Sequence, residues 1–395
     1  MNFFILSILK AALVAVVLLT LCAYLVWIER KVLAHIQLRP GPYRVGPHGL
    51  LQPLADVIKL VFKEGIIPGS SNKFFFLLAP FLAAFIALLS IAVIPFGPEV
   101  EIFGVRTQMG LANFDASLLF ILAISSLGVY GIAIGGWASG SKYSLMGGLR
   151  SSAQMISYEL PLALALAAPL LLLNTLNFRE MIGAQQGYYF GFLPRWTIFM
   201  GPFPQLFSFI LFLIAGFAET NRIPFDLPEA EAELVAGFHT EYSSSCFAAY
   251  FTAEYANMVT VCCVSTLIFL GGWQPLWPSA YGSDFVPTVL FGAVALLMLY
   301  HATQPLRFWD KYSYPVFVVL FLVLAAAFQV PFLKPILVPF FWFAAKVFFL
   351  LFLFIWVRGT LPRFRYDQLM SFAWTFMFPA AVLNLLVTGL LVALL

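Results

Sequence analysis

Ten apolar stretches, separated mostly by short polar segments, limit what this chain can fold into. A bilayer hydrocarbon core of about 30 Å is crossed by about 20 apolar residues in a helix that rises about 1.5 Å per residue. The stretches that reach or approach this length are Ile5–Ile28, Phe74–Ile94, Ala116–Gly136, Ser157–Leu173, Gly201–Ala218, Phe247–Gly271, Phe285–Ala302, Pro315–Val330, Pro335–Val357 and Phe372–Leu394. Since 62% of the 395 residues are hydrophobic and only 10% are charged, the chain lacks the charged surface of a soluble protein. The sequence therefore predicts an all-α polytopic transmembrane helical bundle of about 10 spans.

Lysine and arginine residues concentrate in alternate loops between these stretches. The five odd-numbered loops contain 15 of the 21 basic residues, seven of them in the first loop, whereas the even-numbered loops contain four. By the positive-inside rule, the odd loops face the cytoplasm and both termini face the outer side of the membrane. Because the basic residues never form a run, the net charge of +3 gives no reason to expect a nucleic-acid partner. The partner that the composition predicts is the lipid bilayer.

The first loop has the pattern of a short amphipathic helix. Apolar side chains recur at helical spacing in the segment LLQPLADVIKLVFKE, whereas Asp56, Lys59 and Lys63 fall elsewhere on the helical wheel. Such a helix can lie in the membrane interface with its apolar face toward the hydrocarbon. A helix packed against neighbouring protein explains the same pattern.

Seven of the 18 acidic residues gather between Glu219 and Tyr255, where Arg222 is the single lysine or arginine. These acids are Glu219, Asp226, Glu229, Glu231, Glu233, Glu241 and Glu254. A charged side chain at the centre of a membrane helix costs about 2.5–3.5 kcal/mol on insertion scales. Glu229 and Glu233 also suit the first turn of a helix, where acids interact favourably with the helix dipole. Glu219 closes one apolar stretch and Glu254 lies inside the next, so each needs a partner, a polar cavity or a proton. Clustered carboxylates of this kind are what a proton relay requires.

Two further charges lie in or beside apolar stretches. Glu159 stands at the start of the fourth stretch, and Lys346 lies near the middle of the ninth. Lys346 is too deep for its side chain to reach the interface easily. A structural ion pair and a functional counter-charge are both compatible with Lys346.

Motifs for redox cofactors are absent from the sequence. No GxGxxG, P-loop, HExxH or CxxC is present, the four histidines are scattered, and the four cysteines lie in or beside apolar stretches. We therefore expect no metal site and no covalently bound cofactor. Any redox chemistry is expected in another chain.

Four motifs, read in chain order, resemble one family. They are ERKVLAHIQLRPGPYRVGPHGLLQPLADVIKLVFKE, GWASGSKYSLMGGLRSSAQMISYELPL, FAETNRIPFDLPEAEAELVAGFHTEY followed by AEYANM, and WVRGTLPRFRYDQLM. The sequence resembles the H subunit of the proton-pumping NADH–quinone oxidoreductase, respiratory complex I, from the first span to beyond Met370. The resemblance implies a subunit of the bacterial cytoplasmic membrane that forms a quinone tunnel and the start of a proton route. It implies quinone as substrate, with iron–sulfur clusters and flavin only in partner subunits, and no catalysis by the isolated chain.

The resemblance also assigns roles to individual residues. It places Glu29, Arg30, Arg39, Asp56, Lys59, Arg222, Phe247, Phe251, Arg358 and Arg363 along the quinone channel. It places Glu159, Glu219, Asp226, Glu229, Glu231, Glu241 and Glu254 at the start of the proton route, to which we add Lys346 from its position. The implied partners are the quinone-site subunits of the peripheral arm on the cytoplasmic side, together with small and antiporter-like membrane subunits.

The chain departs from the family pattern mainly between Gly272 and Pro335. The family usually has a short connection there, whereas this sequence has two additional apolar stretches. We therefore divide the chain into a core of residues 1–275, an inserted helix pair of residues 276–334 expected at the periphery, and a two-helix remainder of the core, residues 335–395. A smaller departure is Gly140, where Asn is common.

Two other functions fit parts of the pattern. The equivalent subunit of a membrane-bound hydrogenase or formate hydrogenlyase shares the wider family, although the motifs favour the quinone enzyme. A self-sufficient cation transporter explains the intramembrane charges, but no inverted repeat is evident along the chain.

Overall fold

The computed structural model describes residues 3–102, 105–200, 204–226, 235–304 and 308–394. Each of the ten predicted apolar stretches contains a helix, and eight of the helical segments are long and apolar enough to cross a membrane. The eight contain α1 (Phe3–Ile36), α3 (Lys73–Ser90), α4 (Ser117–Ala138), α5 (Lys142–Leu173), α9 (Ser244–Phe269), α10 (Val286–Ala302), α12 (Lys334–Thr360) and α14 (Phe378–Leu394). Two shorter apolar helices, α7 (Leu206–Glu219) and α11 (Phe308–Ala327), complete the set. The predicted all-α membrane bundle is confirmed.

Several helices extend beyond their apolar stretches, and α5 is the clearest case. Helix α5 begins at Lys142, whereas the apolar pattern predicted a start at Ser157. The polar segment between these points remains helical because its small side chains are buried against neighbouring helices, among them Ser144, Gly147 and Ser151. The last span likewise begins early, with α13 (Tyr366–Phe372) and a π-helical turn, η6 (Ala373–Met377), before α14.

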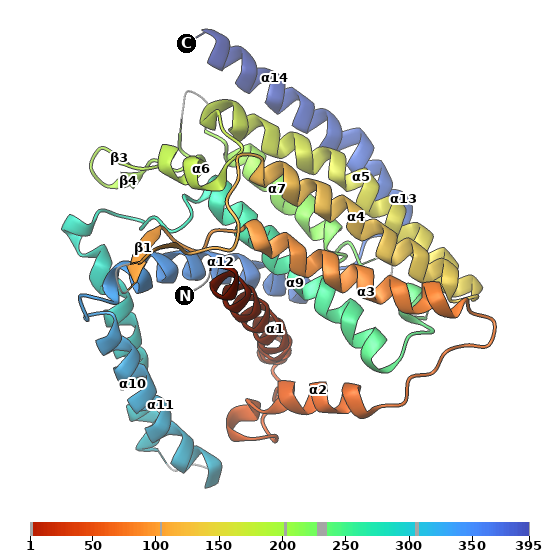
Figure 1. Ribbon diagram of the computed structural model, residues 1–395, viewed down its shortest axis with the longest axis horizontal. Helices are drawn as coiled ribbons and strands as arrows, with labels where there is room; N and C mark the ends of the chain where they lie inside the picture. Colours follow the sequence, from red (N-terminus) through yellow and green to blue (C-terminus); the bar gives the residue numbers. More distant parts are fainter. Residues whose placement is uncertain (1–2, 103–104, 201–203, 227–234, 305–307, 395) are drawn as a thin grey trace.

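Short elements cap the two ends of the bundle (Figure 1). At one end lie the hairpin of β1 (Glu99–Ile102) and β2 (Val105–Gln108), the hairpin of β3 (Tyr188–Tyr189) and β4 (Leu193–Pro194), helix α6 (Phe178–Ala184) and the turn η2 (Ile91–Val93). The N-terminal part of α1 reaches the same end, because Lys10 donates a hydrogen bond to Thr107. Helices α2 (Gln52–Phe62) and α13 lie at the other end.

The amphipathic pattern of the first loop forms helix α2, preceded by the turn η1 (Pro47–Gly49). Leu54, Val57 and Val61 are all about half exposed or more, as expected for a face that lies against lipid. The end of α2 is fastened to the start of α9, because the Ser244 hydroxyl donates to the carbonyl oxygens of Leu60 and Lys63 at 3.1 and 2.7 Å. The first loop therefore has a fixed position beside α9.

The central core is formed mainly by α3, α4, α5, α7 and α9. Helix α9 is buried along most of its length, and its residues Tyr250, Tyr255 and Phe269 are among the largest fully buried side chains. Small residues allow the neighbouring helices to approach closely: Gly131 of α4 faces Ala83 of α3, and Gly136 of α4 faces Gly148 of α5. Close packing through small residues is typical of membrane helices, which lack a hydrophobic driving force for association.

The helix pair α10–α11 lies to one side of this bundle (Figure 1). It is preceded by the turns η4 (Ser279–Tyr281) and η5 (Ser283–Phe285). Its aromatic side chains contribute to a second, smaller core around Phe328, Val338 and Trp342, separate from the central one. Most of its large apolar side chains are exposed, as expected for a pair that faces hydrocarbon on several sides.

Candidate functional site

Glu29 forms the centre of a buried group of charged side chains. It lies in α1, is only 4% exposed and accepts a 2.6 Å hydrogen bond from the Tyr255 hydroxyl of α9. Its other carboxylate oxygen accepts a hydrogen bond from Arg358 at the end of α12. A buried carboxylate requires such partners, because an unpaired charge in the interior is very costly. Three helices far apart in sequence therefore converge on this carboxylate.

Arg222 connects Glu29 to a second acid. It follows α7 and is 6% exposed, and its guanidinium lies 3.9 Å from Glu29 and 4.0 Å from Glu254 of α9. The same guanidinium lies 4.1 Å from the centre of the Tyr255 ring, within range of a cation–π interaction. The Nε2 atom of His239 lies 3.4 Å from Oε1 of Glu254. Acids and bases thus alternate in the order Glu29, Arg222, Glu254 and His239.

Two small cavities continue this row of charges into the bundle. Glu254 and Glu219 line one cavity of about 30 Å³, together with Asn257 and Tyr250. Glu219 and Asn257 also line a second cavity of about 40 Å³. A cavity of roughly 10–15 Å³ has room for one water molecule when polar groups surround it. Each cavity can therefore hold water beside Glu219, and the first can hold water between Glu219 and Glu254.

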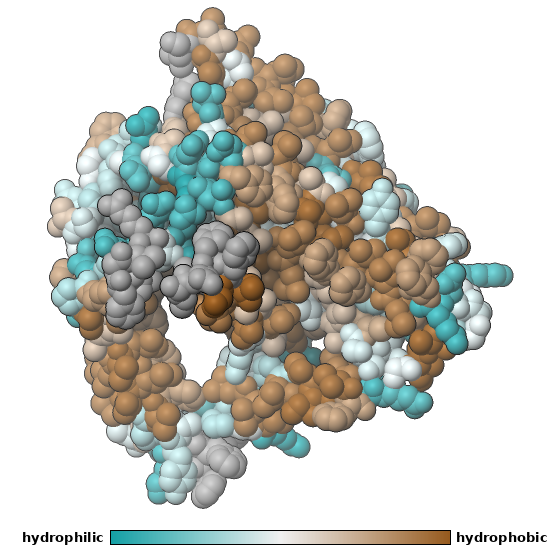
Figure 2. Space-filling view, in the orientation of Figure 1, coloured by the Kyte–Doolittle hydropathy of each residue, from teal (hydrophilic) through white to brown (hydrophobic). Residues whose placement is uncertain are grey.

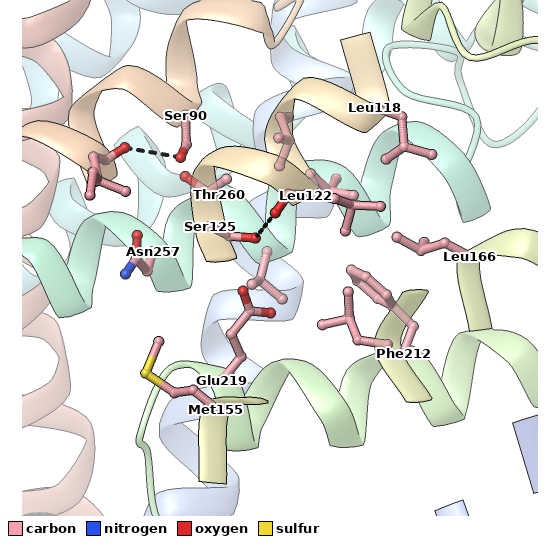
Figure 3. A pocket seen from close by; sticks show the side chains of 15 residues that line it. Ser90, Leu118, Leu122, Ser125, Met155, Leu166, Phe212, Glu219, Asn257 and Thr260 are labelled. Carbon is pink, nitrogen blue, oxygen red and sulfur yellow. Dashed lines mark hydrogen bonds between the residues drawn. The ribbon is translucent and has the colours of Figure 1, made fainter. Parts of the chain in front are cut away.

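Figure 3 shows how Glu219 enters the second cavity. Its carboxylate extends from the end of α7 toward Ser125 of α4, while Asn257 and Thr260 of α9 contribute further polar atoms to the wall. Glu219 points toward Ser125, whose hydroxyl donates to the Leu122 carbonyl oxygen at 3.0 Å, and Glu159 of α5 is close enough to Glu219 to interact with it electrostatically. The Glu159 carboxylate accepts a hydrogen bond from the neighbouring Ser126. Glu159 and Glu219 therefore lie beside two adjacent serines of α4.

Asp226 lies at the outer end of the same loop as Arg222. It is 4% exposed, and its carboxylate accepts a 2.9 Å hydrogen bond from Arg363. The loop is held from the α5 side by Gln154, whose amide donates to the carbonyl oxygens of Ala218 and Phe225 at 2.8 and 2.7 Å. The Gln154 side chain thereby holds the backbone on both sides of Arg222.

Aromatic side chains form a stripe along one face of α9. Phe247, Phe251 and Tyr255 recur every four residues, with ring centroids 5.9 and 5.0 Å apart. The stripe runs from the beginning of α9, beside α2, to the Tyr255 hydroxyl that binds Glu29. A groove of about 200 Å³ lies nearby between α1, α3 and α9, with walls that include Leu19, Leu88 and Ala256. The charged group is thus approached by an apolar surface.

The other predicted site residues are more dispersed. Arg30 lies on the outer side of α1 and forms a 2.9 Å ion pair with Asp56 of α2. Arg39 and Lys59 are exposed, and Glu241 is half-buried and forms no ion pair with a described residue. Glu229, Glu231 and Glu233, together with the helix start predicted around them, lie outside the described residues.

Lys346 is buried away from the acids. Its ammonium group donates to the carbonyl oxygens of Leu270, Gly272 and Gln274 at 2.6, 2.9 and 2.6 Å. It also lies 4.3 Å from the centre of the Trp196 ring. These carbonyl groups belong to the end of α9 and the turn that follows, where a helix leaves its last carbonyls without internal partners. The geometry supports a cap for α9 as the role of Lys346.

Several residues of the site escaped the sequence analysis. His239, Tyr255, Asn257, Gln154 and Ser126 were not singled out, although all except Ser126 lie within the motifs quoted above. The spacing of Phe247, Phe251 and Tyr255 was a usable signal, because residues four apart share a helix face. His239 offered no such signal, since a single histidine in a loop has many possible roles. Within the described parts of the chain, no cluster of three acidic, histidine or cysteine side chains forms a candidate metal site.

Replacing Gly147 with alanine tests the packing that positions His239. Gly147 of α5 faces the turn η3 (Gly237–His239), and an added Cβ would lie 2.7 Å from the Gly237 Cα atom and from the Phe238 nitrogen. Since backbone atoms cannot yield as a flexible side chain does, we expect a loss of about 1–3 kcal/mol in stability. A thermal-unfolding measurement on the detergent-solubilised protein reports this loss. Gly183→Ala in α6 is the control, because no atom lies within 4 Å of its added Cβ; equal unfolding temperatures in the two variants would contradict the prediction.

Comparisons with known proteins agree with this architecture. The family model described as NADH dehydrogenase matches residues 9–389. A protein of Solibacter usitatus named as H subunit 1 of NADH-quinone oxidoreductase is 61% identical over 392 residues, covering 99% of this chain and 98% of its own length. Proteins of Koribacter versatilis and Geobacter metallireducens, each named as H subunit 2 of the same enzyme, are 46% and 42% identical, over 99% and 100% of this chain and 98% and 97% of their own lengths. Since these matches run nearly end to end, they include the segment of α10 and α11. The chain therefore belongs to the NADH dehydrogenase family, whose model matches it from residue 9 to residue 389.

Proposed function

We propose that this chain is a membrane subunit of a redox-driven, proton-translocating NADH–quinone oxidoreductase. In this role it forms the access path for quinone and the start of a carboxylate proton route. The observation that carries the proposal is the buried row of Glu29, Arg222, Glu254 and His239 beside an aromatic stripe, in a chain 61% identical to a protein named as an H subunit of this enzyme. The aromatic stripe provides an apolar path for a quinone, and the row of charged side chains provides polar groups at the end of that path.

The stripe and groove suit the two parts of a quinone. An isoprenoid tail is apolar and enters from the bilayer, and the groove between α1, α3 and α9 is lined by apolar side chains such as Leu19 and Leu88. A quinone headgroup has two carbonyl oxygens that accept hydrogen bonds, and the donors near the end of the stripe are Tyr255, Arg222 and His239. Phe247 and Phe251 provide flat aromatic surfaces along which the headgroup can pass. Arg30, Asp56 and Arg358 border this path at the end of α1 and near α2.

The carboxylates suit a proton route that responds to the charge of the quinone. Reduction of a quinone adds negative charge, which the site balances by moving protons toward it. Glu254 and Glu219 line one cavity, and Glu159 lies close to Glu219, so the three acids are placed in order for proton transfer. A proton gained at one end is thereby relayed along Glu254, Glu219 and Glu159. This chain supplies positioning groups and proton carriers, while partner subunits carry the flavin and the iron–sulfur clusters.

The ends of the bundle suit different partners. The connection before α13 carries Arg363 and Arg365 at the same end of the bundle as α2, and both arginines are at the surface. This end is the one that the positive-inside rule assigns to the cytoplasm, so we propose it as the docking surface for the quinone-site subunits of the peripheral arm. The apolar flanks are left for small and antiporter-like membrane subunits, and residues 276–334 form a peripheral unit.

Replacing Glu219 with glutamine tests the proton route directly. The substitution retains the size of the side chain and removes its titration, so we expect the assembled complex to translocate fewer protons per electron. Proton uptake by vesicles and NADH oxidation are measured together on the same preparation. Glu101→Gln is the matched control, because Glu101 is exposed on β1 and belongs to no part of the row. Wild-type quinone reduction with a wild-type proton-to-electron ratio would exclude Glu219 from the coupling route.

A second measurement separates this proposal from a self-sufficient cation transporter. The purified chain is reconstituted alone into vesicles and tested for cation flux. The proposed role predicts no redox-independent flux, since the reaction that drives proton movement occurs with partner subunits. Sustained cation flux by the isolated chain would favour the transporter.

A further inference from the structure

The helix pair α10–α11 is fastened to the rest of the protein at two separate places. In the first half of α11, the rings of Tyr314 and Phe317 lie 5.1 and 6.4 Å from the ring of His48 in η1. At the other end, Phe328 packs with Val338 and Trp342 of α12 in the second core. The α10–α11 pair is therefore joined to the first loop at one end and to the beginning of α12 at the other.

Between these two attachments, the pair stands away from the bundle. Figure 2 shows an opening that passes through the molecule between the helix pair and the rest of the chain, in the region that Figure 1 places between α11 and α1. We call this opening the window. Helices that border it expose large apolar side chains at mid-length, for example Leu13 and Val16 of α1 and Val319 and Val323 of α11. In a membrane such surfaces are covered by hydrocarbon.

The closed outline of the window restricts its occupant. A spanning helix has a diameter of about 10–12 Å with its side chains and emerges at both membrane surfaces. Because α11 contacts η1 at one end and α12 at the other, such a helix would have to thread through a closed ring of this chain. A lipid needs no such threading, since its flexible acyl chains enter sideways from the bilayer.

The charges around the window are asymmetric along its length. At the η1 end, Arg44 and Lys311 are exposed, and Lys31 lies 4.8 Å from the centre of the Trp27 ring. The carboxylate of Asp56 at this end is already engaged by Arg30 and Gln52. At the opposite end, Lys334 is paired with Asp284 at 3.0 Å. Clusters of basic residues between spans attract anionic lipid headgroups, and among the described residues the exposed basic side chains gather at the η1 end.

We propose that an anionic phospholipid occupies the window, with its acyl chains between the α10–α11 pair and the bundle and its headgroup near Arg44 and Lys311. The lipid completes the packing of a helix pair whose described side chains contact the rest of the protein mainly at η1 and at the beginning of α12. The pair then serves as a clamp that retains one lipid against α1 and α12. This inference depends on membrane insertion and not on the proposed quinone chemistry.

The test uses the assembled complex and a phosphatidylglycerol whose acyl chain carries a diazirine. Illumination followed by peptide mapping is expected to label peptides from α11 and from α1 or α12. The double variant Arg44→Gln and Lys311→Gln is expected to retain this lipid roughly tenfold less, because both headgroup charges are removed. Lys63→Gln combined with Lys142→Gln is the matched control, with two exposed lysines away from the window. A phosphatidylcholine probe with the same acyl chain reports the contribution of headgroup charge.

Several results overturn the proposal. Labelling by phosphatidylglycerol that is unchanged in the double variant, or equal labelling by phosphatidylcholine, excludes an anionic-lipid site. A photoreactive amino acid placed at Val319 distinguishes the other occupant, since cross-links to a protein subunit in place of lipid mean that a partner fills the window. Complex assembly and thermal stability are measured for both double variants, and lipid retention is compared only between variants whose complex is intact. Normal quinone reduction by a lipid-depleted variant leaves the proposed function intact while the lipid contact is tested separately.

Discussion

Replacing Arg222 with methionine is expected to reduce quinone reduction by the assembled complex at least about tenfold, which corresponds to about 1.4 kcal/mol on the reaction barrier. Arg222 lies between the carboxylates of Glu29 and Glu254, at 3.9 and 4.0 Å, and is almost fully buried. Without its guanidinium, two buried acids lose a shared cation. Removal of one partner from a buried ion pair typically costs about 3–5 kcal/mol. The acids are then expected to take up protons or admit water, which changes the polar end of the aromatic stripe.

The measurement compares quinone-linked and artificial-acceptor NADH oxidation in the same membranes. Activity with an artificial acceptor reports the peripheral redox subunits, and a selective loss of quinone-linked activity places the defect at this site. Arg195→Met is the matched control, because Arg195 is exposed beside β4 and far along the bundle from Glu29. Arg222→Lys retains a charge but not the planar group over Tyr255, so it is expected to be intermediate. Normal quinone reduction in the methionine variant would remove Arg222 from the proposed path.

Replacing Lys346 with methionine is expected to destabilise the protein while leaving proton coupling intact. Three backbone carbonyls at the end of α9 lose their donor, and each buried carbonyl without a partner costs about 1–3 kcal/mol. Relief from burying the ammonium charge offsets part of this cost. We expect a net loss of about 3 kcal/mol, seen as a lower thermal-unfolding temperature of the solubilised protein.

The same variant decides between two roles for this lysine. Among the described residues, the acceptors of the Lys346 hydrogen bonds are backbone carbonyls and not carboxylates. The structure therefore gives no reason for the proton-to-electron ratio to change. Lys334→Met on the same helix is the control, because that lysine forms a largely exposed pair that typically contributes about 0–1 kcal/mol. A stable variant with a reduced ratio would assign Lys346 to the proton route.

The spans could be predicted because hydrocarbon thickness imposes a length and a composition on each helix. Helix starts could not be predicted from the same rule. The segment from Lys142 to Ile156 has no apolar run, yet it is helical because small residues such as Gly147 and Ser151 pack against the bundle. Such packing depends on which helices become neighbours, and the sequence does not contain that information in a local pattern. The window beside α10–α11 was invisible for the same reason.

The candidate site was predicted in part. Glu29, Arg222, Glu254 and Glu219 were identified from their motifs and from their cost near hydrocarbon, and the structure brings all four into one row. The partners of these side chains could not be predicted, because they come from distant parts of the chain; Glu29 and Arg358, for example, are 329 positions apart. Lys346 shows the opposite case. Its depth suggested a structural ion pair or a functional counter-charge, whereas three backbone carbonyls accept its hydrogen bonds, and such carbonyls leave no mark in the sequence.

The loop that carries Arg222 has a consequence for the speed of the response. Gln154 holds its two flanks through the carbonyls of Ala218 and Phe225, and the Phe364 amide donates to the Pro224 carbonyl at 3.1 Å. A segment restrained in this way has little freedom to swing when a nearby charge changes, so its reorganisation energy is small. On the proposed proton route, a change of charge beside Glu29 would therefore act on Glu254 across Arg222 without waiting for this loop to move.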